Sequence, residues 1–322
     1  MLNDKELLKI FNEYLLRQDF GNTPSNLYDP IYYTLKAGGK RIRPILCLLS
    51  TELFGESYES SLDIACGIEI FHNFTLLHDD MMDKSDIRRG NPTVHKKWTD
   101  SIALLSGDAM SVIAYKYISK AKYLSETLDL FSDTALKICE GQQLDMDYEN
   151  MSDISVEDYL KMINLKTAVF LAASLKIGAI SANTNRENKS NIYEFGRNLG
   201  MAFQLQDDYL DTYGDSEKFK KNLGGDIASN KKTFLLLKAL ELAKGNVLNE
   251  LKYWIALKEF DKNEKINAVK NIYDALNILK YSEGKIDYYM NEASQYFAKI
   301  NADKNKKDIL LNYTNSLGQR KF

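Results

Sequence analysis

Six aspartates form two copies of the spacing Asp-Asp-x-x-Asp, and each copy ends a long apolar stretch. The two triplets are Asp79, Asp80 and Asp83, and Asp207, Asp208 and Asp211. On a helix, the first and last members of a triplet lie one turn apart on the same face, where their charges repel. Hard divalent cations such as Mg²⁺ prefer such oxygen ligands and relieve the repulsion. A single acidic cluster is often only a solvated helix face, but the repeat favours a metal site.

Metal ions held by two facing acidic helices commonly bridge phosphate oxygens, so we expect a substrate that carries a diphosphate or a similar polyanion. Basic residues occur beside this pattern. Lys40, Arg41 and Arg43 follow a Gly-Gly pair, and Arg88 and Arg89 follow the first acidic cluster. Arginine forks bind phosphate oxygens through two hydrogen bonds, which suits a second anion that has no metal of its own.

The elements that position these residues are predicted to be helices. The last proline is Pro92, so most of the 322-residue chain has no proline to interrupt a helix. Apolar residues recur at helical spacing, and no alternating strand pattern or Asn-Gly hairpin interrupts them. We therefore predict one all-α domain over residues 1–322. The segments "SANTNRENKSN" and "GDSEKFKKNLGGD" are polar and rich in helix breakers, which predicts the least ordered parts.

Composition excludes several classes of protein. The net charge of -3 and the pI near 5.8 give no general attraction to nucleic acid or acidic lipids. Cys47, Cys66 and Cys139 have neither a paired nor a metal-type spacing, which suits a reducing compartment. The N-terminus lacks the pattern of a secretory signal, and the apolar run at 168–180 contains Lys176 and is too short to span a bilayer. We expect a soluble, cytoplasmic protein without a membrane span.

The motifs, in their order along the chain, resemble those of the all-trans prenyl diphosphate synthases, the farnesyl and geranylgeranyl diphosphate synthase family. They are "GGKRIRP", "LLHDDMMDKSDIRRGNPTVH", "KTA", "GMAFQLQDDYLD" and "GGDIASNKKT". The resemblance implies an all-α bundle of long helices around a deep central cavity, the isoprenoid synthase fold, and a homodimer. It also implies a prenyltransferase that condenses isopentenyl diphosphate with dimethylallyl, geranyl or farnesyl diphosphate.

The resemblance assigns a role to each motif residue. Asp79, Asp83 and Asp207 would bind about three Mg²⁺ ions per active site, with Mn²⁺ as a substitute, and Asp80, Asp208 and Asp211 complete the catalytic clusters. The allylic diphosphate would be bound by Arg88, Lys166, Thr167, Gln204, Lys221 and Lys232, with Lys166 also catalytic. Isopentenyl diphosphate would be bound by Lys40, Arg43, His72 and Arg89. Many relatives have Gly-Lys where Lys220 and Lys221 stand, which weakens the assignment of Lys221.

The reaction implied by the resemblance uses electrostatics rather than a protein nucleophile. Metal ions and cationic side chains stabilise the departing diphosphate, and an allylic cation forms in an apolar cavity. We expect the released diphosphate to take the final proton, with His78 and His95 structural.

Phe74 lies five residues before Asp79, about 7.5 Å along a helix, and would limit chain growth beside the small Thr75. This favours geranylgeranyl over farnesyl diphosphate as the product.

Two other functions stay open. A class I terpene cyclase also ionises a diphosphate, but it would not incorporate isopentenyl diphosphate. A silent regulatory subunit is expected to lose acidic ligands, whereas this chain keeps both sets.

Overall fold

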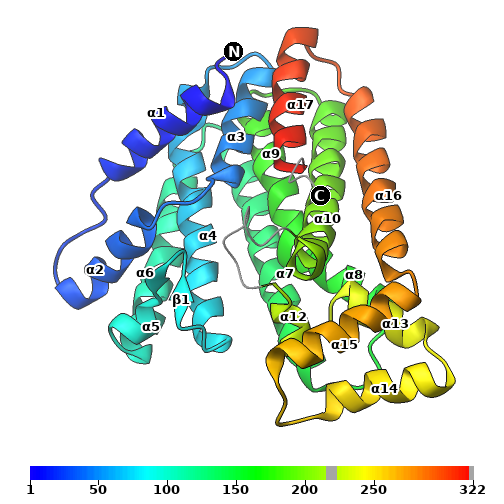
Figure 1. The fold of residues 1–322 in the computed structure, drawn as a ribbon. Coiled ribbons are helices and arrows are strands. Elements are labelled where there is room, and N and C mark those ends of the chain that lie inside the picture. Colours follow the sequence, from blue (N-terminus) through cyan, green and yellow to red (C-terminus); the bar gives the residue numbers. More distant parts are fainter. Residues whose placement is uncertain (215–222, 319–322) are drawn as a thin grey trace. The chain divides into compact units, whose positions relative to one another are not determined.

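The computed structural model describes residues 1–214 and 223–318, and this part of the chain is almost entirely helical (Figure 1). The longer helices of the first half are α1 (Asp4–Leu16), α2 (Ser25–Lys36), α3 (Ile42–Leu53), α4 (Leu62–Met82), α6 (Asp100–Ile118) and α7 (Leu124–Asn150). Those that follow are α8 (Val156–Ile163), α9 (Val169–Ser181), α10 (Arg186–Tyr213), α13 (Phe234–Leu242), α14 (Gly245–Ala256), α15 (Lys262–Ala275), α16 (Ile278–Ala298) and α17 (Lys304–Gly318). Short helical turns are η1 (Tyr58–Ser61), α5 (Val94–Lys97), η2 (Asn164–Ala168) and α12 (Gly225–Ala228).

Contacts between Cα atoms divide the chain into two compact units. Unit 1 comprises Met1–Ser132, Ala173–Ser190 and Asn301–Tyr313, and unit 2 comprises Asp133–Ala172, Asn191–Ile300 and Thr314–Phe322. Most of their boundaries fall inside helices, and the one between Ile300 and Asn301 falls in the connection between α16 and α17. The expectation of one domain over residues 1–322 stays a prediction.

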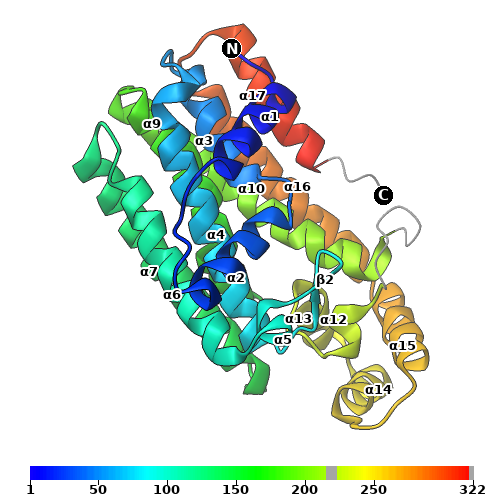
Figure 2. The same cartoon turned by 90° about the vertical axis from the view of Figure 1, so that its left-hand side faces the viewer.

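In unit 1, α4 is the central helix. It packs mainly against α6 and α3, and Figure 2 shows these helices side by side. The stretch from Ile64 to Phe71 is buried on every side of the helix, as expected for an element that is apolar all round. Its burial fixes the direction in which the helix presents its polar C-terminal end.

In unit 2, the core lies around α13. The side chains of Phe234 and Leu237 pack with Tyr159 and Met162 of α8, while Leu235 and Leu236 join a second cluster with α14 and α15. Thr233 begins α13 by accepting a hydrogen bond from the Leu236 amide, so the helix starts directly after the "SNKK" segment.

Three local predictions are wrong. Residues 87–92 form a two-stranded antiparallel hairpin of β1 (Ile87–Arg88) and β2 (Asn91–Pro92), although no strand pattern was expected. The polar segment after Ser181 is mostly helical, because α10 begins at Arg186. The apolar run at 168–180 belongs to a longer helical stretch, Val156–Ser181, which is long enough to cross a membrane.

Burial argues for a core role for that stretch, since 72% of its most apolar window lies inside the protein. The second segment predicted to be poorly ordered contains residues 215–222, which lie outside the described residues, and it runs into α12.

Candidate active site

The first acidic cluster lies at the C-terminal end of α4. The Asp83 amide donates to the Asp79 carbonyl over 2.9 Å, which confirms that these residues are one helical turn apart. Ser85 donates to the Asp80 carbonyl and Lys84, at φ 52°, donates to Met81, so the helix ends in a Schellman motif. The negative end of the helix dipole adds to the charge of the carboxylates, and this end of α4 therefore favours a cation.

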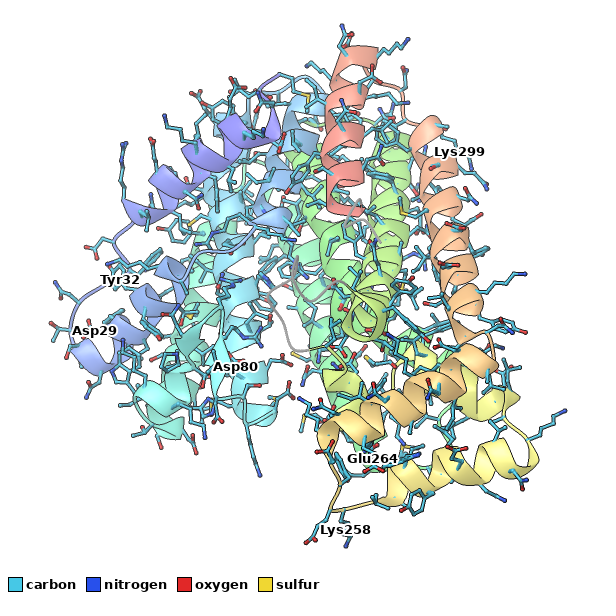
Figure 3. All side chains as sticks on the ribbon, in the orientation of Figure 1. Asp29, Tyr32, Asp80, Lys258, Glu264 and Lys299 are labelled. Carbon is cyan, nitrogen blue, oxygen red and sulfur yellow. The ribbon has the colours of Figure 1, made fainter. Side chains whose placement is uncertain are left out.

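Within this cluster, Asp80, which is labelled in Figure 3, differs from Asp79 and Asp83 in being buried. The Arg88 guanidinium donates from Nε to both Asp80 carboxylate oxygens, over 2.7 and 2.8 Å, and its Nη2 lies 3.6 Å from Asp79 Oδ2. Burial raises the pKa of Asp80, and the charge of Arg88 opposes that rise. Asp83 is exposed. The sequence therefore places a positive counter-charge against its own acidic cluster.

The hairpin positions Arg89. Arg89 and Gly90 form its turn with φ of 53° and 76°, a left-handed conformation that is uncommon for arginine. The Arg89 guanidinium donates to the Gly38 carbonyl and lies against Gly39, whose missing side chain leaves room for it. This contact joins the "GGKRIRP" loop to the hairpin.

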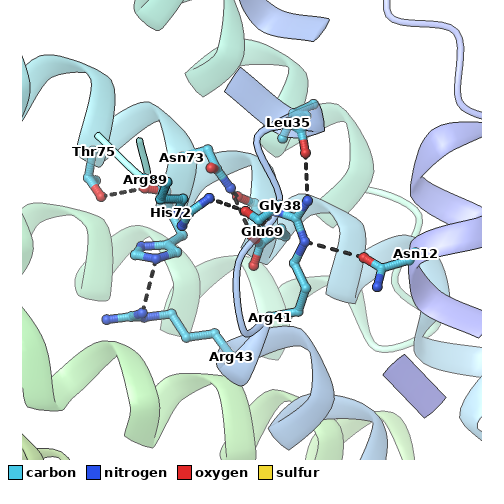
Figure 4. Close-up of polar contacts among 10 residues, drawn as sticks. All are labelled: Asn12, Leu35, Gly38, Arg41, Arg43, Glu69, His72, Asn73, Thr75 and Arg89. Carbon is cyan, nitrogen blue, oxygen red and sulfur yellow. Dashed lines mark hydrogen bonds and ion pairs between the residues drawn. The ribbon is translucent and has the colours of Figure 1, made fainter. Parts of the chain in front are cut away.

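His72 and Arg43 form a partly buried pair (Figure 4). Arg43 Nη1 lies 3.3 Å from His72 Nε2, and a guanidinium has no acceptor, so Nε2 must accept and the proton of the neutral ring is on Nδ1. Burial, followed by the charge of Arg43, lowers the pKa of His72 well below its usual value. Burial also lowers the pKa of Arg43 to about 10. Lys40 is exposed.

Phe74 lies on α4 before the acidic cluster, in an aromatic series. Its ring centroid is 5.2 Å from that of Phe71 and 4.8 Å from that of His78. Thr75 donates from Oγ1 to the His72 carbonyl over 2.8 Å. The His78 ring is held near the Leu104 carbonyl, in keeping with a structural role.

The second acidic cluster lies at the end of α10 in unit 2. Asp207 is exposed, whereas Asp208 is buried and accepts hydrogen bonds from the Tyr159 hydroxyl and from Gln204 Nε2, the latter over 3.1 Å. Burial and the nearby charge of Asp226 raise the pKa of Asp208 to about 7. Asp211 accepts from the Asp226 amide over 2.9 Å. The middle aspartate is again the buried one, which repeats the arrangement of the first cluster.

Lys166 and Thr167 lie in η2, a π-helical turn in which the Val169 amide donates to the Asn164 carbonyl. Lys166 Nζ lies 2.5 Å from Asp145 Oδ2, and Thr167 Oγ1 donates to Gln204 Oε1 over 3.1 Å. Insertions of this kind are frequent at functional sites because they redirect side chains.

The two lysines of the last motif, Lys231 and Lys232, differ in their surroundings. Lys232 is partly buried beside the start of α13, and Lys231 is the lysine whose charge lowers the pKa of Asp208. Lys221 lies outside the described residues.

The carboxylates fit a divalent cation that shares its coordination with a ligand. Among residues 1–214 and 223–318, no group of three His, Cys, Asp or Glu side chains could hold a metal ion by itself. Mg²⁺ commonly takes one or two carboxylates and completes its shell with water and phosphate oxygens. The paired carboxylates Asp79 and Asp83 at a helix C-terminus supply that donor set.

Sequence reasoning missed Tyr159, Asp145 and Glu69, which contact predicted site residues or their neighbours. The contacts join residues that are 49, 21 and 28 positions apart, so no local pattern connects them. The spacing of Gly141 and Asp145, one helical turn apart in "GQQLD", was the available signal.

Residues 24–275 match the family model of the polyprenyl synthetases. A geranylgeranyl diphosphate synthase from Sulfolobus acidocaldarius is 35% identical over 94% of this chain and 92% of that protein. A geranylfarnesyl diphosphate synthase from Natronomonas pharaonis is 38% identical over 73% of this chain and 74% of that protein. The crystal structure of a geranylgeranyl pyrophosphate synthase has a TM-score of 0.94 and 41% identity, with 100% of both chains covered. These matches confirm the predicted all-α isoprenoid synthase fold.

Proposed function

Since this chain belongs to the polyprenyl synthetase family and is a prenyltransferase, we propose that it extends an allylic diphosphate with isopentenyl diphosphate to give geranylgeranyl diphosphate. The observation that supports this most directly is the shared design of the acidic clusters. In each, the middle carboxylate is buried against protein donors while the first aspartate is more accessible. In such a site the buried middle aspartate fixes the end of the helix, and the accessible aspartates are positioned to bind a metal ion.

In this proposal, Asp79, Asp83 and Asp207 are the ligands of a divalent metal, with about three Mg²⁺ ions per active site and Mn²⁺ as a substitute. The bound metal would neutralise the charge of the allylic diphosphate. Asp80 and Asp208 act as positioning residues, because Arg88 holds one and Tyr159 with Gln204 holds the other. Asp211 anchors the start of α12 through the Asp226 amide.

Cationic and polar side chains bind the departing diphosphate. We assign this role to Arg88, Lys166, Thr167, Gln204, Lys221 and Lys232. Lys166 also serves catalysis, and Asp145 orients its ammonium group. Charge developed at the leaving group is stabilised by groups that are already oriented, which favours the transition state over the ground state.

Isopentenyl diphosphate is bound by Lys40, Arg43, His72 and Arg89. Because His72 is neutral and its Nε2 accepts from Arg43, the imidazole is already engaged and is not available at that atom as a base. This supports diphosphate itself as the acceptor of the proton lost after condensation.

The remaining features are also proposals. Phe74 and Thr75 set product length, the protein is a homodimer of a single all-α domain, and it works in the cytoplasm. Farnesyl diphosphate is the alternative product.

A product assay tests the proposal. Purified protein with Mg²⁺, labelled isopentenyl diphosphate and each allylic primer should give labelled geranylgeranyl diphosphate. Asp79→Asn should lower kcat by about 10²–10³, as removal of a key electrostatic group does, while Asp129→Asn on the exposed face of α7 should not. Cyclised product without label would identify a terpene cyclase, and no product with any primer would point to a silent subunit.

A further inference from the structure

We infer that Arg41 and Glu69 form a buried ion pair that positions the isopentenyl diphosphate-binding residues, and that Arg41 itself does not touch the substrate. The inference rests on the proposed function. It is unexpected from the sequence, because Arg41 lies between Lys40 and Arg43 in "GGKRIRP" and has the same chemistry as its neighbours.

Each nitrogen of the Arg41 guanidinium has a partner inside unit 1 (Figure 4). Its Nη1 lies 2.6 Å from Glu69 Oε1, its Nη2 donates to the Leu35 carbonyl over 2.5 Å, and its Nε donates to Asn12 Oδ1 over 3.4 Å. The side chains of Arg41 and Glu69 are 3% and 2% exposed. A diphosphate could reach this guanidinium only by displacing the carboxylate, so Arg41 is withdrawn from the anion site.

Glu69 is held from a second direction. Asn73, one turn further along α4, donates from Nδ2 to Glu69 Oε1 and to the Glu69 carbonyl, both over 2.8 Å. The carboxylate therefore has a fixed position on a buried helix, and Arg41 must come to it.

The backbone of the loop does not favour this conformation by itself. Gly38, Gly39 and Arg41 have φ of 76°, 134° and 50°, and an arginine with positive φ is strained. The turn at Arg41 sends its side chain inward while Lys40 stays exposed. Burial of the ion pair against α2 and α4 is the interaction that selects this turn.

The Arg41–Glu69 pair is one of three contacts that hold the loop at residues 38–43. Arg43 contacts His72, which lies three residues after Glu69 on α4, and Arg89 donates to the Gly38 carbonyl. The Arg41–Glu69 and Arg43–His72 contacts thus join the start of α3 to adjacent turns of α4, and the Arg89–Gly38 contact joins the loop to the hairpin. Loss of the Arg41–Glu69 contact should therefore make the positions of both Lys40 and Arg43 less fixed.

Buried ion pairs offer a way to separate positioning from stability. Removal of one partner leaves an uncompensated buried charge, whereas replacement of both by apolar residues is often neutral for stability. We propose Arg41→Met, Glu69→Leu, the double variant and Arg41→Lys, each assayed for thermal unfolding and for the KM of both substrates.

Both single variants should lower the melting temperature, and the double variant should recover most of that loss. The KM for isopentenyl diphosphate should nevertheless stay raised about tenfold in the double variant, as for other supporting residues, while the KM for the allylic substrate is unchanged. Arg41→Lys should raise the KM for isopentenyl diphosphate less than Arg41→Met does. Lysine keeps a charged contact with Glu69 but lacks the several donors of the planar guanidinium.

Recovery of both stability and KM in the double variant would overturn the inference and leave the pair structural only. A raised KM in Arg41→Met together with a normal KM in Glu69→Leu would overturn it too, since Arg41 would then bind substrate. If the wild-type protein uses no isopentenyl diphosphate, the proposed function fails separately. In that case hydrogen exchange of the 38–43 loop tests the positioning role. The double variant should exchange faster there than the wild type, and an unchanged rate would contradict the inference.

Discussion

His72 is surrounded by positive charge. Burial lowers its pKa most, and the guanidinium groups of Arg43, Arg89, Arg88 and Arg41 lower it further. A second cation in this place would repel its neighbours, so the folded protein keeps the ring neutral. The free energy of unfolding therefore depends on pH, because His72 can bind a proton in the unfolded chain but stays neutral in the folded protein.

The pH dependence of unfolding tests this description. An unfolded histidine binds a proton near pH 6.5, whereas folded His72 does not, so below that pH the unfolded state binds more protons. The free energy of unfolding should therefore fall as the pH drops from 7 to 5.5, by up to about 1.4 kcal/mol per pH unit from this residue. Urea unfolding should show a shallower slope for His72→Gln, while His78→Gln keeps the His72 contribution. Equal slopes for wild type and His72→Gln would contradict the account.

A second residue-scale test concerns Phe74. Among the described residues, its ring contacts the rings of Phe71 and His78. Phe74→Ala should keep turnover within about threefold, since no catalytic group is lost, and should shift products to longer chains. Chromatography of the dephosphorylated products measures the shift. An unchanged distribution would make Phe74 an ordinary core aromatic, and Leu16→Ala on the exposed face of α1 is the control.

At the scale of elements, the π turn of η2 depends on a glycine in another helix. A Cβ on Gly141 of α7 would lie 2.7 Å from the Lys166 Cα, which is backbone and cannot swing away. The close approach of these two helices is therefore possible only with glycine. It sets the place from which Lys166 reaches Asp145.

Two glycine substitutions should have opposite effects. Gly141→Ala should lower the free energy of unfolding by about 1–3 kcal/mol through overpacking, and should lower kcat because Lys166 and Thr167 move. Gly284→Ala, in the middle of α16 with open space around it, should raise the free energy of unfolding by about 0.4–1 kcal/mol. Denaturant unfolding of both variants measures this. A neutral Gly141→Ala would show that the helices separate easily.

The sequence predicted the long helices, whose apolar residues repeat over several turns, and did not predict the short elements. The acidic ends of α4 and α10 were predicted because apolar spacing and charge are both local. The hairpin was missed because two-residue strands have no period to detect. The start of α10 was misjudged because Ile192 and Phe195, which pack in the core, outweigh the low helix propensity of the Asn-rich residues before them. Tyr159 and Asp145 reach the site through tertiary contacts that the order of residues does not reveal.

At the scale of the whole molecule, exposed apolar residues on α6 support the proposed homodimer. Leu104, Leu105 and Val112 are 48%, 59% and 62% exposed, and Leu105 and Val112 lie two turns apart on one face. Large apolar side chains gathered on a surface commonly mark an interface.

Lysines on that face should prevent association. Light scattering of the wild type should give about twice the chain mass of 36.9 kDa, and Leu105→Lys with Val112→Lys should give a single chain mass. Tyr253→Lys, at an exposed position on α14, should leave the mass unchanged. A wild-type mass of one chain would contradict the dimer, and an unaltered mass in the double variant would place the interface elsewhere.

Helix α4 carries Phe74 and Asp79 on one rigid, buried element, and this has an evolutionary consequence. If Phe74 and Thr75 set product length as proposed, a substitution at either position would change the space beside the helix and keep the carboxylates at its end. Selection could then alter product length through one or two codons. A geranylgeranyl and a geranylfarnesyl diphosphate synthase both resemble this chain at similar identity, and on this proposal few substitutions would separate such products.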